Sequence, residues 1–408
     1  MRTFTKIVSA AAALALMGTV TACGTGNNAG DDTVTISFQH QFNDVQTQAI
    51  ETLVARFEEE HPSIRVNLLR NNDSAFYDAL VTQILGGGGP DIVRVEPPRV
   101  PQYIASGWTL PLDDIFDPAN FFPAAVEALT SPDGQLHGVP FDIDALALFY
   151  RPDMLETAGI TEVPQTWEDF RTAAVAMTDG DTYGAGLFGG WGAFTFYPWL
   201  WQAGGQVLNE NQTEAAFNSP EGVAALQFWV DLQNSAMPPG MATAGEDEVR
   251  GPFVAGRIGM IPSGPWAIPS LKETGIDWAV APLPADKESA TVLGGMSLLA
   301  LANTSHPDQV KTFLTWLMDD ENLGEYYAAV GGIPAKTSLF NDPAFANDPY
   351  VSAFQAILET ARNRPTIEEA GLIDEALTEA IQAALAGTSS PQAALDAAAA
   401  RVNEALND

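Results

Sequence analysis

The segment from residue 137 to residue 150 constrains the fold more than any other part of the sequence. Residues 146–150 form a short, nearly all-apolar run, which is typical of a strand buried on both faces. Just before this run, Asp142 and Asp144 alternate with apolar residues, so an extended chain turns both carboxylates to one side. A buried carboxylate needs water, a ligand or hydrogen-bond donors, and we therefore interpret the segment as a cleft-lining crossing between two lobes. A strand entrance with solvated acids would give the same local pattern.

The order of the other predicted elements indicates an α/β fold. Alternating apolar residues predict strands at 33–38 and 64–68, and a short apolar run predicts another at 91–95. Apolar residues at helical spacing predict helices at 50–57 and 76–85. Strands that alternate with helices form parallel sheets covered by helices. Because 408 residues exceed one comfortable core, we expect two such lobes.

The N-terminal region indicates export and lipid anchoring. Residues 1–22 have a basic start, a short apolar core and small residues at the end, as secretory signal peptides do. Cys23 is the only cysteine, and its position after residues 20–22 is similar to the lipobox of bacterial lipoproteins. We expect lipidation of Cys23, which would anchor the protein to the cell membrane on the extracytoplasmic side, with residues 23–32 as a flexible tether. A free thiol in a secreted protein is the alternative.

Charge and motif content exclude several classes of function. The chain has 52 acidic residues against 18 lysines and arginines, and no basic stripe offsets this charge, so nucleic acid is excluded as a partner. The four histidines are scattered and the one cysteine is the predicted lipid site, so we expect no metal centre and no cofactor. No Gly-x-Ser-x-Gly motif occurs, and neighbours on one strand such as Asp142 and Asp144 cannot face each other across a glycosidic bond. We therefore expect no enzyme.

Two aromatic groups are candidates for a ligand surface. Trp266 follows the predicted strand 258–261 on a turn rich in proline and glycine, and open α/β sheets bind ligands at the ends of strands. Trp191, Phe194 and Tyr197 lie near a glycine turn and could face a cleft, with burial in the core as the alternative. Loops after predicted strands and a glycine-containing run provide further candidates, namely His40, Asn43, Glu96, Arg99 and Gly295.

Five short motifs, spread over nearly the whole chain, carry a family resemblance. They are Gly89-Pro90-Asp91-Ile92-Val93, Gly107-Trp108 through Pro111-Leu112-Asp113, Val139-Pro140 through Asp144-Ala145-Leu146 to Tyr150, Pro164-x-Thr166-Trp167-Glu168, and Gly256-x-x-x-Met260-x-x-x-Gly264-Pro265-Trp266. In this order they resemble bacterial extracellular solute-binding protein family 1, the sugar-binding lipoproteins of ABC importers that include the maltodextrin-binding proteins.

The resemblance implies a fold of the periplasmic-binding-protein type. Its two lobes are mixed sheets flanked by helices, joined by three hinge crossings, and they close on a sugar. The crossings are expected near Pro140, Leu293 and Gly332. The first lobe would then comprise residues 33–140 and 294–332, and the second lobe residues 141–293 and 333–408.

The resemblance also implies a function and roles for single residues. The implied ligand is a carbohydrate, the implied partners are the permease subunits of an ABC importer, and the protein would be a monomer. Asp144 falls where the family often has an acid that accepts hydrogen bonds from sugar hydroxyls. Trp266 falls where a tryptophan stacks on a pyranose ring, and Phe194 or Tyr197 matches an aromatic position of the second lobe.

Some departures from the family argue against maltodextrin as the ligand. The loops 39–43 and 94–99 lack the tryptophan and lysine of the maltodextrin type, and residues 366–374 include no aromatic residue. Two other functions share the sequence pattern. One is a secreted carbohydrate-active enzyme such as a glycoside hydrolase, and the other is a solute receptor that reports to a membrane sensor.

Overall fold

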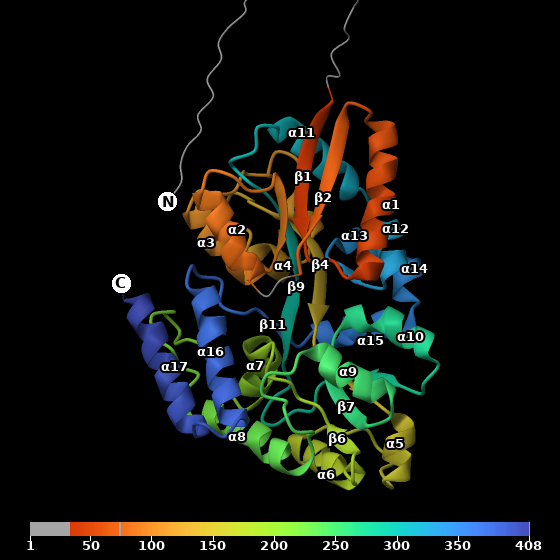
Figure 1. The fold of residues 1–408 in the computed structure, drawn as a ribbon, viewed down its shortest axis with the longest axis vertical. Coiled ribbons are helices and arrows are strands. Elements are labelled where there is room, and N and C mark those ends of the chain that lie inside the picture. The colour runs from red at the N-terminus through yellow and green to blue at the C-terminus, as the bar shows by residue number, and fades with distance from the viewer. Residues whose placement is uncertain (1–32, 73–74, 408) are drawn as a thin grey trace, which may run out of the picture.

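The computed structural model describes residues 33–72 and 75–407, which form two α/β lobes around two separate sheets (Figure 1). The larger sheet has seven strands and the smaller sheet has four. The predicted signal peptide, Cys23 and the tether lie outside the described residues.

The larger sheet is mixed, as predicted. Its strand order is β10-β4-β9-β3-β1-β2, with β11 beside β9. Strand β1 runs parallel to β2 and β3, whereas β9 runs antiparallel to β3 and β4. The strands are β1 (Val34–His40), β2 (Ile64–Arg70), β3 (Ile92–Val95), β4 (Val139–Ala145), β9 (Thr291–Ala300), β10 (Ile333–Pro334) and β11 (Ala361–Arg362).

Helix α1 (Asp44–Glu60) illustrates how the sequence produces the helices of this lobe. Asn43 caps it, and the side chains of Asn43 and Gln46 each bond to the other's backbone N–H in a capping box. One face of the helix is apolar and packs into the core through Ile50, Leu53, Val54 and Phe57. The other helical elements around the larger sheet are α2 (Phe76–Leu85), η1 (Pro97–Arg99), α3 (Val100–Ala105), η2 (Pro118–Asn120), α4 (Pro123–Glu127), α11 (Pro307–Leu317), α12 (Asp320–Val330), α13 (Thr337–Phe340) and α14 (Pro343–Ala346).

The smaller sheet is also mixed and has the order β6-β7-β5-β8. Strand β5 is antiparallel to β7 and β8, and β6 is parallel to β7. The strands are β5 (Ala147–Tyr150), β6 (Tyr183–Ala185), β7 (Ile258–Ser263) and β8 (Ala279–Ala281). Around them lie α5 (Pro152–Thr157), α6 (Trp167–Met177), α7 (Gly192–Gln202), α8 (Pro220–Ser235), α9 (Glu246–Val254), η3 (Pro265–Ala267), α10 (Ile268–Thr274), α15 (Pro349–Leu358), α16 (Ala370–Leu385) and α17 (Pro391–Leu406). Figure 1 shows α16 and α17 side by side at the outer edge of this lobe.

The first two passages between the sheets are short. Strand β4 belongs to the larger sheet and β5 to the smaller one, so the chain changes sheets at Leu146. It returns to the larger sheet where β9 begins at Thr291. We therefore place the first lobe boundary at Leu146, a few residues after the predicted crossing near Pro140.

The third passage is later than the predicted crossing near Gly332. Strand β10 still pairs with β4, and Phe340 packs edge-on against Phe122 of the larger lobe. In contrast, Tyr350 of α15 stacks on Trp278, which precedes β8 in the smaller lobe. We infer that the chain passes to the smaller lobe between these two contacts, in the region 341–349.

The passages are hydrogen-bonded to one another. The hydroxyl of Thr291 donates a 2.7 Å hydrogen bond to the carbonyl of Leu146. Strand β11 lies parallel to the start of β9, with Ala361 opposite Thr291 and Arg362 opposite Val292. The segment that leads to α16 therefore joins the sheet at the point where the chain passes between the lobes.

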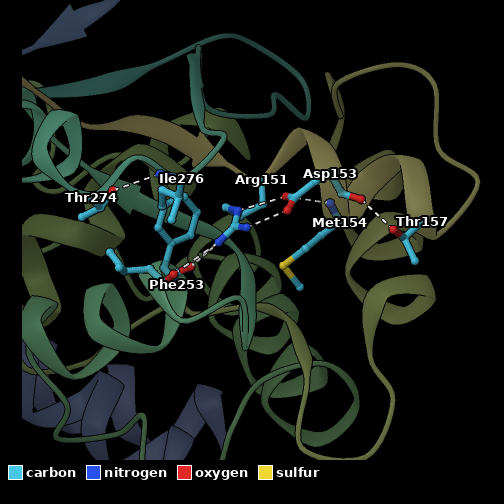
Figure 2. A network of polar contacts seen from close by, with 8 residues as sticks. Arg151, Asp153, Met154, Thr157, Phe253, Thr274 and Ile276 are labelled. Atoms are coloured by element: carbon cyan, nitrogen blue, oxygen red, sulfur yellow. Dashed lines mark hydrogen bonds and ion pairs between the residues drawn. The ribbon is translucent and has the colours of Figure 1, made fainter.

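Arg151 fixes the end of β5 to the end of helix α9. Its side chain is buried, its guanidinium forms two hydrogen bonds with the carboxylate of Asp153, and it donates to the carbonyls of Phe253 and Val254 (Figure 2). These carbonyls lie in the last turn of α9, where Phe253 O also accepts a 3.1 Å hydrogen bond from the backbone N–H of Gly256. The C-terminal end of α9 is thus held by a buried charge-assisted network.

Gly295 has a structural reason to be glycine. Its φ of 119° is unfavourable for residues with a side chain, and a Cβ atom would lie 2.2 Å from the carbonyl oxygen of Asp142 on β4. The close pairing of β4 and β9 therefore requires glycine here, whether or not a ligand contacts it.

Candidate functional site

The predicted acids of β4 lie on one face of the larger sheet, as the alternation indicated. Phe141 and Ile143 are buried, whereas Asp142 and Asp144 point to the other face and are partly accessible. Arg94 of β3 pairs with Asp142, with 2.9 Å between Nη2 and Oδ2. The guanidinium of Arg94 also lies 4.7 Å from the centre of the Phe42 ring. Asp142 therefore already has a cationic partner inside the protein.

Asp144 has no such partner. Its Oδ1 atom is buried and makes no hydrogen bond within the described part of the chain. Burial, followed by the nearby charge of Asp142, raises the pKa of the Asp144 carboxyl to about 8. Gly294 lies opposite Asp144 on β9, and a Cβ atom there would come within 2.0 Å of Oδ1 and 3.0 Å of the Phe194 ring. Glycine thus lets the acid of one lobe approach the aromatic ring of the other.

Arg364 links the two lobes beside this contact. It is 4% exposed, and its Nη1 atom lies 3.1 Å from Glu96 Oε2 and 3.0 Å from Asp374 Oδ2. Glu96 follows β3 in the larger lobe, whereas Asp374 lies on α16, which packs on the smaller lobe. The guanidinium also lies 5.2 Å from the centre of the Phe194 ring. One arginine therefore contacts a carboxylate from each lobe and an aromatic ring.

A small cavity of about 20 Å³ lies next to this cluster. Its lining includes Asp142, Gly294, Ser297, Asn363 and Arg364. The Oγ atom of Ser297 and the Nε atom of Arg364 are buried and without a hydrogen-bond partner among the described residues. The space is large enough for one water molecule or one ligand hydroxyl, which would satisfy these groups.

The smaller lobe contributes a group of aromatic side chains. The Trp266 ring centre lies 5.9 Å from that of Trp191 and 6.5 Å from that of Phe194. Trp191 is 40% exposed, and Phe194 and Trp266 are partly buried. The indole N–H of Trp266 donates a 2.7 Å hydrogen bond to Glu246. Partly exposed aromatic rings next to carboxylates and a guanidinium can bind a molecule that has both apolar faces and hydroxyl groups.

The structure places three other predicted residues in supporting positions. His40 extends β1 and is buried beside Phe42, whose backbone N–H donates to its Nδ1 atom. Burial, with a further contribution from Arg94, lowers the pKa of His40 to about 4. Asn43 is the cap of α1, and the buried Tyr197 donates its hydroxyl hydrogen bond to Asp374. These contacts give each residue a role within the protein itself.

Arg99 lies closer to the site. It sits on η1, 4.4 Å from the centre of the Tyr77 ring, and a Cβ atom on Gly371 of α16 would lie 3.0 Å from its guanidinium. The structure thus brings together Asp142, Asp144, Glu96, Arg99, Phe194 and Trp266 around the meeting point of the lobes. Arg364, Asp374 and Glu246 were not predicted. No local pattern in the sequence distinguishes these charged residues from those on the surface.

Two negative findings apply to residues 33–72 and 75–407. No group of three or more histidine, cysteine, aspartate or glutamate side chains is arranged to hold a metal ion there. No helix in that part of the chain has both the length and the apolar content needed to cross a membrane.

Two lobes that are joined by several passages of the chain and meet at a polar and aromatic site define a two-lobed α/β binding protein. The family model for bacterial extracellular solute-binding proteins matches residues 43–323. The chain belongs to this family.

Named relatives extend the comparison. The maltodextrin-binding protein MdxE of Bacillus subtilis is 25% identical, over 95% of this chain and 94% of its own length. A solute-binding protein of an ABC transporter from Thermotoga lettingae, solved with α-D-tagatose, has a TM-score of 0.85 and 27% identity, covering 91% of this chain and 99% of its own. The GacH receptor of Streptomyces glaucescens, solved without ligand and with acarbose, has a TM-score of 0.83 and 26% identity, covering 91% and 97%.

Asp144→Asn should change how stability depends on pH. The folded protein keeps the proton of Asp144 up to about pH 8, whereas the unfolded chain loses it near the ordinary value of 3.8. Between these values the folded state binds more protons, so Asp144 makes the free energy of unfolding fall as pH rises. Urea unfolding between pH 4 and pH 8 should show a smaller fall for Asp144→Asn. His40 titrates in both proteins, so its opposite effect cancels in the comparison. The variant Asp113→Asn, at an exposed site, is the control, and equal curves for wild type and Asp144→Asn would exclude a raised pKa.

Proposed function

We propose that this protein is the carbohydrate receptor of an ABC importer and holds its ligand between the two lobes. The observation that carries the proposal is that Asp144 and Phe194 both lie against Gly294, which brings an acid of the larger lobe near aromatic rings of the smaller lobe. A sugar ring has apolar C–H faces that suit aromatic rings and hydroxyl groups that suit carboxylates and guanidinium groups.

The relatives support this class of ligand without specifying one member of it. MdxE is named for maltodextrin, and the two solved structures contain tagatose and acarbose. These ligands differ in size. In this chain Arg364 pairs with Glu96 and Asp374, and residues 366–374 contain no aromatic side chain. We propose a carbohydrate ligand, permease subunits as partners and no catalytic role. Asp142 is already paired with Arg94, so Asp144 is the acid of β4 that is more available to a ligand.

A thermal-shift screen with mono- and oligosaccharides tests the proposed ligand class. A ligand at about a hundred times its dissociation constant stabilises the protein by about 2.7 kcal/mol. Trp266→Ala should then weaken binding of the ligand found by about 1–3 kcal/mol, because a stacking surface is lost. The change also removes the hydrogen-bond donor to the buried Glu246, so the melting temperature should fall as well. Trp316→Ala, on α11 of the larger lobe, is the matched control and should leave affinity unchanged. Conversion of the sugar during incubation would favour a carbohydrate-active enzyme, and an unchanged affinity of Trp266→Ala would remove Trp266 from the site.

Ligand binding should close the lobes. A ligand that contacts both lobes binds the closed form more tightly, and only that difference can shift the population. We propose that the passages near Leu146, Thr291 and residues 341–349 act as hinges and that Asp144 binds the ligand. Small-angle scattering should show a monomer whose radius of gyration falls on addition of the sugar. Asp144→Ala should raise the dissociation constant about ten- to a hundredfold, whereas Asp113→Ala, at an exposed site, should not. An unchanged radius of gyration at saturation would contradict closure, and an unchanged affinity would remove Asp144 from the site.

We also propose that Cys23 carries the lipid that anchors the receptor outside the cytoplasm. Its place after a signal-like segment supports this. Cys23→Ser should move the protein from the detergent phase to the aqueous phase in a Triton X-114 partition, because the acyl chains are lost. A variant that stays in the detergent phase would show that something else holds it.

Uptake of the sugar by cells that lack the gene decides between an importer and a sensor. If the protein is an importer subunit, these cells should lose uptake, whereas loss of a sensor's receptor should leave the transport itself intact.

A further inference from the structure

The orientation of the Trp266 indole is fixed by two contacts within the smaller lobe. The ring lies directly against Gly264, where a Cβ atom would come within 2.1 Å of Cζ3. The indole N–H donates a 2.7 Å hydrogen bond to Oε2 of Glu246, the first residue of α9. One contact sets the position of the six-membered ring and the other sets the position of the N–H edge. Together they determine the plane of a side chain that is only partly buried.

Glu246 is itself held in place. It is 5% exposed, and the hydroxyl of Ser263 donates a hydrogen bond to its other oxygen, Oε1. Arg250, one turn along the same helix, has its Nη1 atom 3.8 Å from Oε1. Each carboxylate oxygen therefore has its own donor, and Ser263 ends the strand after which Trp266 follows. The acid links the end of β7, the turn that carries Trp266 and the start of α9.

Helix α9 does not need Glu246 for its own ends. At the N-terminus, Glu248 accepts a 2.9 Å hydrogen bond from the backbone N–H of Gly245 and so provides the capping contact. At the C-terminus, Arg151 binds the last carbonyls (Figure 2). Burying a carboxylate is unfavourable, and burial raises the pKa of Glu246. An acid in the first turn favours a helix, but Asp247 and Glu248 are acids of the same turn, so Glu246 is distinguished by its burial and by the donors to both of its oxygens.

We propose that Glu246 is a positioning residue that holds the Trp266 indole in the plane in which it stacks on a ligand. This inference rests on the proposed function, because it assigns the stacking surface to Trp266. A ring already held in its bound orientation loses less conformational freedom when the ligand arrives, which strengthens binding without a further contact. Glu246 acts through Trp266 and does not touch the ligand.

A readout that needs no ligand tests the positioning directly. The full chain is labelled with 5-fluorotryptophan, and Trp266→Phe identifies the Trp266 signal in the fluorine NMR spectrum. Glu246→Met removes the acceptor at similar volume and should shift and broaden this signal. Glu246→Gln keeps an oxygen acceptor for the indole and a donor for Ser263, so it should restore the wild-type signal. The matched control, Glu248→Met, removes the capping contact of the same helix and should leave the Trp266 signal unchanged.

Binding provides the second readout, with tagatose, maltotriose and acarbose as probes. For any probe that binds wild type, Glu246→Met should weaken binding about fivefold, as expected when one side chain must be immobilised on binding. In the Trp266→Phe background, the same change should weaken binding less than about twofold, because the indole N–H is already absent. If Glu246→Met does not fold, Ser263→Ala is the replacement variant, because it removes the donor to the other carboxylate oxygen of Glu246. It should shift the Trp266 fluorine signal in the same direction.

The outcomes separate this inference from the proposed function. An unchanged Trp266 signal in Glu246→Met overturns the positioning role, and so does an equal loss of affinity in the wild-type and Trp266→Phe backgrounds. Either result leaves a sugar receptor intact if a probe binds. If no carbohydrate of the wider screen binds, the proposed function fails, and the fluorine spectrum alone still decides whether Glu246 orients Trp266.

Discussion

The antiparallel pairing of β4 with β9 is the interaction on which the site depends. It sets Asp144 opposite Gly294 and keeps both strands in the larger sheet up to the points where the chain changes lobes. Two glycines make the pairing possible, since a side chain on Gly294 would collide with Asp144 and one on Gly295 would collide with the backbone of β4. The acids of the larger lobe therefore reach the aromatic rings of the smaller one because two neighbouring positions on β9 have no side chain.

The whole chain is strongly acidic, whereas the site also contains buried arginines. The sequence has 52 acidic residues against 18 lysines and arginines, yet Arg94 and Arg364 are both buried in the cleft region. Each is paired with at least one carboxylate, which offsets the cost of removing the charges from water. Within this cluster, Oδ1 of Asp144 is buried and has no hydrogen-bond partner among the described residues. A ligand group that forms a hydrogen bond with this oxygen would therefore contribute strongly to the binding free energy.

Local patterns predicted the elements of the fold better than the members of the site. The strand 33–38 and the helix 50–57 were predicted from their spacing. In the structure β1 continues to His40, inside the predicted loop 39–43, and α1 begins at Asp44, directly after that loop. His40 is therefore a buried residue of the core, and Asn43 is the cap of α1, although both were predicted to lie in a ligand-binding loop. Arg364 could not be predicted, because its partner Glu96 is 268 positions away and nothing local indicates burial of an arginine. Asp144 and Trp266 could be singled out in the sequence because alternation and turn residues are local signals, and their binding of a ligand stays a prediction.

The hydrogen bonds between the passages have a mechanical consequence. Thr291 binds Leu146, and β11 lies along the first residues of β9, so the segments that join the lobes are coupled to one another. Three independent connections would permit twisting, sliding and bending in any combination. If the lobes close as proposed, coupled connections favour one motion, a rotation about a single line through the sheet edge. The lobes would then meet in the same register each time, which would give the proposed closed form a reproducible geometry.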